Sequence, residues 1–375
     1  MKILFTGGGT GGHFYPIIAV SEAIKRHASK NKLIPPDLYF LAPDPYSPKI
    51  LFDNQIKYYQ IPAGKMRIYS SIENFFDMFT TGIGVIAALW RVFWIYPDVI
   101  FSKGGYGSFP VVLAGHILGI PIVVHESDSV PGRANSWAAK YADKIAVSYP
   151  DAAKFFDEKK VAWTGSPVRK EISFVTKEGA KQFLNLEDEI PVIFVLGGSQ
   201  GAKLINDLMI DILPQLVERF QIVHQTGKAN FKEVKETADM VLNMSQYAKR
   251  YKPFDYLDDL AMRMASGSAS LVISRAGSTI FEIALWGVPS ILIPITDSNG
   301  DHQRKNAYNY ARSGGALVIE ESNLNKTILM EEIEKIFSNK ERYDNMAEGA
   351  KSFAKPEAAD TIALEIINTA LSHEK

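Results

Sequence analysis

Residues 7–13, with the sequence Gly-Gly-Gly-Thr-Gly-Gly-His, combine a flexible turn with a side chain that exchanges protons near neutral pH. They follow the apolar run at 3–5, so we expect a buried strand, a glycine turn and then a helix. Gly7, Gly9 and Gly12 satisfy the dinucleotide pattern, but no acidic residue is well placed for the ribose. The segment predicts a phosphate-binding loop beside a general base, His13, with a capping or packing histidine as the alternative.

A second glycine loop, residues 102–108, follows the apolar run at 99–101. Two phosphate-type turns at the same edge of one sheet suggest a diphosphate ligand. The next apolar run ends in His125 and Glu126, again at a carboxyl end. This pair is either a structural hydrogen-bonded pair beneath the loops or in direct contact with a ligand.

Similar motifs recur in the second half of the chain. Residues 197–202 form a glycine loop that opens a helix, and residues 274–279 open another helix that carries Glu282. A helix N-terminus favours phosphate, and a carboxylate one turn inside can accept both hydroxyls of a ribose. The alternative for Glu282 is a solvated helical residue, but its neighbours are apolar. Residues 301–303 add polar groups suited to sugar hydroxyls.

Parallel sheets must position these motifs, because apolar strand-like runs alternate with helical patterns. We expect strands at 3–5, 38–41, 99–101, 122–125, 144–147, 192–196, 221–224, 271–273 and 290–293. The strand and glycine-loop pattern restarts at Val192, which predicts an α/β protein of two doubly wound domains joined near 164–169. The last helix, about 357–373, could pack on either domain.

The composition is that of a globular protein without disulfides. The chain has 375 residues, 46% hydrophobic and 22% charged, and no cysteine. No signal-peptide pattern precedes the first strand, so we expect the protein to stay in the cytoplasm. The net charge of −1 divides into a slightly basic first half and a slightly acidic remainder, which offers no platform for nucleic acid.

Residues 78–96 carry a single charge, Arg91, in a long apolar stretch. A transmembrane helix is one interpretation. Two glycines, Arg91 and the strand that follows favour a buried crossover helix with part of its surface exposed. Cations and large apolar groups at 65–69 and 75–79 are typical of a membrane-surface patch, with a core role as the alternative.

Seven motifs in order carry a resemblance that spans nearly the whole chain: residues 8–13, 103–106, 125–126, 165–169, 197–202, 274–277 and 301–307. The chain resembles the MurG family of GT-B glycosyltransferases, which transfer N-acetylglucosamine from UDP-N-acetylglucosamine to lipid-linked N-acetylmuramyl-pentapeptide. The resemblance implies two Rossmann-like domains facing across a cleft. It implies an acceptor and membrane-associating domain at 1–165, a UDP-sugar-binding domain at 166–355, and a C-terminal helix at 356–375 that returns to the first domain.

The resemblance also implies site residues. His13 and Glu126 match catalytic positions. The positions matching residues that bind UDP-N-acetylglucosamine are Thr10, Gly11, Gly12, Asn135, Arg169, Ser199, Gln200, Leu257, Glu282 and Gln303. The positions matching the acceptor and its diphosphate are Gly104, Gly105, Tyr106 and His125, with Asn135 also on this side. No cofactor and no metal are implied, and no Asp-x-Asp ligand pair is evident.

Three departures from the family pattern affect individual positions. Ser127 and Asp128 replace the glutamine and asparagine usual after His125-Glu126, so a carboxylate is gained near an expected anion. The segment between Gly277 and Glu282 is one residue shorter than usual. His302 stands where some members have glutamine, and still offers a hydrogen-bonding group.

These residues predict a single displacement with inversion at the anomeric carbon. His13 would be the general base for the acceptor's C4 hydroxyl, while helix N-termini and Arg169 stabilise the leaving UDP. The implied location is the cytoplasmic face of the bacterial cell membrane, with the anionic membrane surface as a peripheral partner. Three alternatives stay open: transfer to another lipid acceptor, epimerisation of UDP-N-acetylglucosamine, and a non-catalytic UDP-sugar-binding protein.

Overall fold

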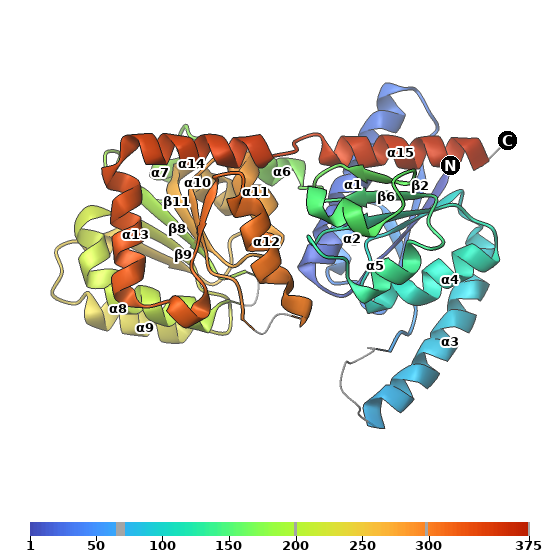
Figure 1. Ribbon diagram of the computed structural model, residues 1–375, viewed down its shortest axis with the longest axis horizontal. Coiled ribbons are helices and arrows are strands. Elements are labelled where there is room, and N and C mark those ends of the chain that lie inside the picture. The colour runs from blue at the N-terminus through green and yellow to red at the C-terminus, as the bar shows by residue number, and fades with distance from the viewer. Residues whose placement is uncertain (65–71, 199–200, 297–298, 374–375) are drawn as a thin grey trace. The chain divides into compact units, whose positions relative to one another are not determined.

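The computed structural model describes the chain except for residues 65–71, 199–200, 297–298 and 374–375 (Figure 1). The fold consists of two compact units. Met1–Arg169 together with Lys355–Lys375 form unit 1, and Lys170–Ala354 form unit 2. The predicted Ser199 and Gln200, and the possible surface patch at 65–69, lie outside the described residues.

Unit 1 is built on a seven-stranded sheet in which every neighbouring pair of strands is parallel. In chain order its strands are β1 Lys2–Thr6, β2 Asp37–Ala42, β3 Ile56–Gln60, β4 Val99–Ser102, β5 Ile122–Glu126, β6 Lys144–Val147 and β7 Val161–Trp163. Their order across the sheet is β3-β2-β1-β4-β5-β6-β7. The order reverses at β1 and β4, which defines the switch point where ligands bind in open α/β sheets.

Helices cover both faces of this sheet, and the alternation of side chains along β1 explains why. Ile3 and Phe5 join the core beneath the first and last helices, while Leu4 joins the core on the opposite face. The helices are α1 Gly11–Lys30, α2 Pro48–Asp53, α3 Ile72–Ile95, α4 Phe109–Ile117, α5 Arg133–Ala138 and α15 Ala358–His373, with 3-10 turns η1 Tyr106–Ser108 and η2 Pro150–Phe155.

The last helix, α15, packs along α1 (Figure 1). Asp360 accepts hydrogen bonds from Arg26 and His27 of α1, at 2.8 and 2.7 Å. The chain therefore ends on the unit in which it begins.

Unit 2 repeats the plan with a six-stranded parallel sheet of order β10-β9-β8-β11-β12-β13. The strands are β8 Val192–Leu196, β9 Gln221–Gln225, β10 Tyr251–Phe254, β11 Ala269–Ser274, β12 Ser290–Leu292 and β13 Ala316–Val318. The helices are α6 Lys170–Ser173, α7 Ala180–Phe183, α8 Lys203–Arg219, α9 Phe231–Val241, α10 Asp259–Ser268, α11 Thr279–Trp286, α12 His302–Ala311, α13 Lys326–Ser338 and α14 Lys340–Phe353, with 3-10 turns η3 Ala248–Arg250, η4 Asn299–Asp301 and η5 Glu321–Asn323. Here the order reverses at β8 and β11.

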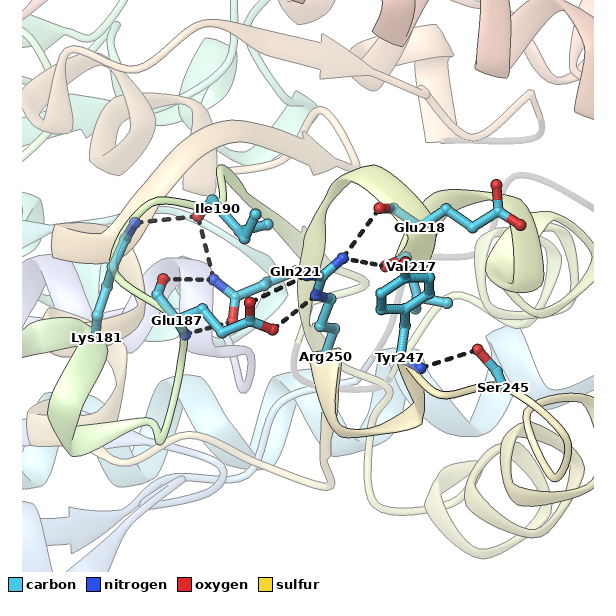
Figure 2. Close-up of polar contacts among 9 residues, drawn as sticks. All are labelled: Lys181, Glu187, Ile190, Val217, Glu218, Gln221, Ser245, Tyr247 and Arg250. Carbon is cyan, nitrogen blue, oxygen red and sulfur yellow. Dashed lines mark hydrogen bonds and ion pairs between the residues drawn. The ribbon is translucent and has the colours of Figure 1, made fainter.

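A polar network ties together the amino ends of the strands in unit 2 (Figure 2). Gln221, the first residue of β9, accepts from the Glu187 backbone at 2.7 Å and donates to the carbonyls of Glu187 and Ile190. Arg250 forms a two-point ion pair with Glu187, at 2.7 and 3.0 Å, and stacks on Tyr247. This edge lies opposite the glycine loops, so the network serves the stability of the sheet.

Helix α3 connects β3 and β4, as a crossover helix should, but it is not buried as expected. From residue 77 on, where its side chains are described, α3 packs inward through a narrow stripe that includes Gly84, Ala88 and Val92, beside α4 (Figure 1). A Cβ atom at Gly84 would lie within 1.9 Å of the Pro62 carbonyl oxygen, so only glycine permits this packing. Arg91 lies over the ring of Tyr59, at 4.7 Å. Among the described residues, α3 is the helix long and apolar enough to cross a membrane by length and composition alone.

Candidate functional site

The two glycine loops of unit 1 meet at the switch point between β1 and β4. Gly105 has φ +80°, and a Cβ atom there would lie 2.9 Å from Gly8 Cα. Only a residue without a side chain allows the two backbones this close approach. The first loop leads into α1, whose N-cap is Thr10, with Gly11 and Gly12 in its first turn. The backbone N–H groups of these residues belong to the N-terminus of α1, which is a suitable binding site for an anion.

His13 lies in the first turn of α1 and rests against the first loop. A Cβ atom at Gly8 would be 2.6 Å from His13 Nδ1 and one at Gly105 would be 3.0 Å from His13 Cε1, so both loops bound the imidazole. Nδ1 is buried and has no hydrogen-bond partner among the described residues. Burial and the charge of Lys103 lower the pKa of His13 to about 4, with Asp128 acting in the opposite direction. The free protein therefore holds this imidazole neutral at physiological pH, the form that accepts a proton.

His125 is fully buried at the end of β5. Its Nε2 lies 3.2 Å from the Gly165 carbonyl oxygen and 3.2 Å from Ser148 Oγ. Burial, Lys103 and His13 hold the pKa of His125 well below its ordinary value. Its Nδ1 has no partner among the described residues.

Glu126 organises the loop that follows β5. Its carboxylate accepts from the backbone N–H groups of Asp128 and Gly132, at 2.8 and 3.0 Å, and from Asn135 Nδ2, at 2.9 Å. The side chain is buried, and burial together with Asp128 raises its pKa. With two donors from its own loop and one from α5, Glu126 fits the structural alternative that the sequence left open. Asp128, where the family usually has an amide, supplies a backbone donor to this loop.

The same Asn135 lies against the second glycine loop, where a Cβ atom at Gly104, which has φ +82°, would collide with the Asn135 amide group. Besides Glu126 it donates to the His125 carbonyl, at 3.2 Å. Its Oδ1 is buried without a partner among the described residues. Unsatisfied buried polar atoms are rare in proteins, so their gathering here on His13, His125 and Asn135 marks a site that a ligand or water completes.

Two further predicted residues, Tyr106 and Arg169, contact the first glycine loop and α1, respectively, since a Cβ atom at Gly9 would lie 3.8 Å from the Tyr106 hydroxyl. Tyr106 begins η1 and is partly buried, and burial and Asp44 raise its pKa. Arg169 lies over the ring of Tyr15, in α1, at 4.1 Å, and belongs to unit 1.

In unit 2, Gln225 at the carboxyl end of β9 joins the loops that follow the two neighbouring strands, β8 and β10. Its side chain donates to the Gly198 carbonyl, at 3.4 Å, and accepts from the Leu257 N–H, at 3.1 Å. Leu257 is buried, and this bond satisfies its backbone N–H. Gln225 thus connects the glycine loop after β8 with the predicted nucleobase-contacting residue.

Glu282 and Gln303 lie on the helices α11 and α12 of the same unit. Glu282 is partly buried in the first turn of α11, among buried apolar neighbours. Gln303 Oε1 accepts from the Ile295 N–H, at 3.2 Å, which holds the loop after β12. Arg275 also contacts that loop: it donates a hydrogen bond to the Ile293 carbonyl and forms a 2.6 Å ion pair with Glu321.

Three residues of these sites, Lys103, Gln225 and Arg275, were not predicted from the sequence. Lys103 and Arg275 lie inside the glycine-loop and helix-opening motifs, directly before Gly104 and Ala276. The signal for Gln225 was weaker, since it is only a polar residue at the end of an apolar strand.

The family models match both units. The N-terminal domain of glycosyltransferase family 28 matches residues 3–147, and the C-terminal domain of the same family matches residues 192–362. The protein is therefore a glycosyltransferase, and the predicted fold class of two parallel α/β units is confirmed.

Relatives with assigned names specify the kind of glycosyltransferase. The chain is 37% identical over 370 residues to "UDP-N-acetylglucosamine--N-acetylmuramyl-(pentapeptide) pyrophosphoryl-undecaprenol N-acetylglucosamine transferase 3" of Bacillus thuringiensis, covering 96% of this chain and 97% of the relative. A Halothermothrix orenii protein of the same transferase name is 36% identical, covering 99% of both chains. The chain belongs to this family of N-acetylglucosamine transferases, as the motifs predicted.

Solved structures share the fold. The crystal structure of Acinetobacter baumannii MurG is 24% identical, with a TM-score of 0.74, and covers 98% of this chain and 99% of its own. The crystal structure of a UDP-GlcNAc 2-epimerase from Neisseria meningitidis, bound to UDP-GlcNAc, is 15% identical, with a TM-score of 0.70. The match covers 99% of this chain and 100% of the epimerase chain.

Proposed function

We propose that this glycosyltransferase transfers N-acetylglucosamine from UDP-N-acetylglucosamine to the C4 hydroxyl of lipid-linked N-acetylmuramyl-pentapeptide. The observation that carries the proposal is the 37% identity, across 96% of the chain, to a relative named for these two substrates. The unpartnered His13 Nδ1 between two anion-type loops supports it independently of any name.

In this proposal unit 1 binds the acceptor and unit 2 binds the donor. His13, neutral before the reaction, takes the proton of the acceptor hydroxyl as that oxygen attacks the anomeric carbon. The bond to UDP breaks on the opposite face, which inverts the configuration. Glu126 acts as a positioning residue, because its carboxylate is occupied by the Asp128 and Gly132 amides and by Asn135.

The donor site is proposed around the loops after β8 and β11. The amino ends of α8 and α11 face the leaving diphosphate and stabilise its growing charge. Gln225 fixes Leu257 for the uracil, Glu282 binds the ribose, and Gln303 contacts the sugar. Ser199 and Gln200 are proposed as further phosphate ligands of unit 2, and Arg169, which belongs to unit 1, is proposed as a phosphate ligand from the resemblance alone.

The exposed face of α3 is proposed as a membrane-binding surface. The face opposite the packed stripe presents Phe79, Ile83, Ile86, Trp90, Phe93 and Trp94, each more than half exposed. An amphipathic helix with tryptophans on its apolar face lies in the membrane interface. Because both ends of α3 lead into strands of one sheet, we propose that it lies on the membrane and does not cross it. This agrees with a substrate anchored at the cytoplasmic face.

The decisive experiment offers the protein UDP-N-acetylglucosamine with and without the lipid-linked muramyl-pentapeptide. We expect a disaccharide lipid and UDP only when the acceptor is present. An epimerised sugar nucleotide formed without acceptor would instead favour the activity that the epimerase neighbours suggest. Binding of the nucleotide sugar with no product from either mixture would leave a non-catalytic binding protein.

A further inference from the structure

Lys103 is a buried cation that forms no ion pair within the described part of the chain. It is the residue after β4, its side chain is 1% exposed, and Nζ has no hydrogen-bond partner among the described residues. Its backbone N–H donates to the Thr6 carbonyl, at 2.9 Å, which fixes the residue between β1 and the second glycine loop. A buried ammonium without a partner is costly, so a protein retains one where a ligand or a reaction uses it.

The charged groups around Lys103 compensate it only in part. From α1 it faces His13, from β5 it faces His125 and Glu126, and from the following loop it faces Asp128. The two histidines are neutral. The carboxylate of Glu126 already accepts three hydrogen bonds from N–H donors. Burial outweighs the two carboxylates and lowers the pKa of Lys103 to about 8.

Glycines of both loops lie near Lys103. Gly7 lies close enough that a Cβ atom there would be 3.4 Å from Lys103 Cβ, and Gly8 and Gly105 touch each other beside His13. Glycine turns of this kind expose amide groups to an anion. We propose that Lys103 supplies the positive charge by which the two glycine loops of unit 1 bind a phosphate-type group of the acceptor.

The binding of that anion would also prepare His13. In the free protein the charge of Lys103 opposes protonation of His13. An anion beside Lys103 neutralises this effect, so the imidazole becomes a stronger base when the acceptor is in place. Lys103 is thus a positioning residue for charge. This inference rests on the proposed function, because it takes His13 as the base and unit 1 as the acceptor side.

The test uses inorganic pyrophosphate as the probe, with the full chain held at saturating UDP so that the donor site is filled. Calorimetric titration compares the parental protein with Lys103→Met and with Lys57→Met, which removes the same charge from an exposed position on β3. We expect Lys103→Met to weaken pyrophosphate binding about tenfold or more and Lys57→Met to leave it unchanged. Equal affinity of all three proteins for pyrophosphate would overturn the proposal. If the parental protein bound no pyrophosphate at saturating UDP, the anion would belong to the donor site, and the proposal would also be overturned.

Two further measurements separate this role from a structural one. The first is an NMR titration, in which the His13 signal is assigned by its absence from His13→Asn. Pyrophosphate should raise the pKa of His13 in the parental protein. An unchanged pKa would contradict the proposal, even if the Lys103 variant fails to fold. Removing an unpaired buried charge should also raise the Tm of Lys103→Met, whereas a structural lysine would lower it.

The transferase assay distinguishes the two hypotheses. If the parental protein forms the disaccharide lipid but Lys103→Met binds pyrophosphate as tightly as the parental protein, only the role of Lys103 is overturned. If Lys103→Met loses pyrophosphate binding but the parental protein does not transfer to the muramyl acceptor, the anion site is retained and the proposed function is rejected.

Discussion

The imidazole of His13 is fitted against the backbone of Gly8, since a Cβ atom at Gly8 would lie 2.6 Å from His13 Nδ1. We therefore expect Gly8→Ala to displace the imidazole and to lower kcat about tenfold or more, with the KM for UDP-N-acetylglucosamine unchanged. Gly9→Ala is the matched control, because its Cβ atom would meet nothing closer than 3.8 Å. Steady-state kinetics that gave both variants the same rate would show that the imidazole position does not matter.

The general base itself can be removed. We expect His13→Ala to lower turnover about a hundredfold or more while UDP binding stays intact, because general-base catalysis contributes a factor of this size. His116→Ala, an exposed histidine of α4 beside Tyr141, is the control and should keep the parental rate. Parental turnover in the His13 variant would refute the assignment.

Unit 2 should lose stability in acid through His224. This fully buried histidine bonds Tyr251 through Nδ1, at 2.9 Å, and Asn206 through Nε2, at 3.0 Å, and burial lowers its pKa to about 3. Between pH 6.5 and about 3 the unfolded chain binds a proton that the folded chain does not, so stability falls as pH falls, by about 1.4 kcal/mol per pH unit.

Thermal unfolding from pH 7.5 to 4.5 tests this prediction against His224→Gln. The variant should be less stable at pH 7.5, and the difference in Tm should shrink as pH falls because only the parental protein loses the His224 contribution. A constant difference would show that His224 is not the group responsible.

Gln225 and Gln221 occupy the two ends of β9 and allow a matched comparison. Gln225→Leu removes the bonds to Gly198 and Leu257, so we expect the KM for UDP-N-acetylglucosamine to rise about tenfold. Gln221→Leu breaks the network of Figure 2 at the other edge and should lower Tm with KM unchanged. An unchanged KM in Gln225→Leu would remove Gln225 from the donor site.

The membrane surface on α3 is testable with lipid vesicles. Trp90 and Trp94 are 61% and 66% exposed and contact each other edge to face, so replacing both by glutamine should leave Tm unchanged and sharply reduce sedimentation with anionic vesicles. The control replaces Met240 and Met244, which are exposed apolar residues of unit 2. Equal vesicle binding by both double variants would place the membrane contact elsewhere.

The nine strands predicted from the sequence are all present, and the four that were missed, β3, β7, β10 and β13, are the edges of the two sheets. Central strands of a parallel sheet are covered on both faces and read as continuous apolar runs. An edge strand is partly exposed, as the burial of β3 and β7 shows, so its sequence lacks that run. Helix α3 shows the converse, since the sequence predicted a buried crossover helix with part of its surface exposed, whereas few of the side chains described along it are buried.

The sequence by itself determined the family, the parallel α/β plan and the glycine loops, because these depend on local residue types and spacing. Only the tertiary structure decided how the polar groups are satisfied. It gave Glu126 two donors from its own loop and one from α5, and it left His13 Nδ1 and Lys103 Nζ buried without partners among the described residues. Such differences arise from contacts between β1, β4 and β5, which lie far apart in the chain and meet only when the sheet forms.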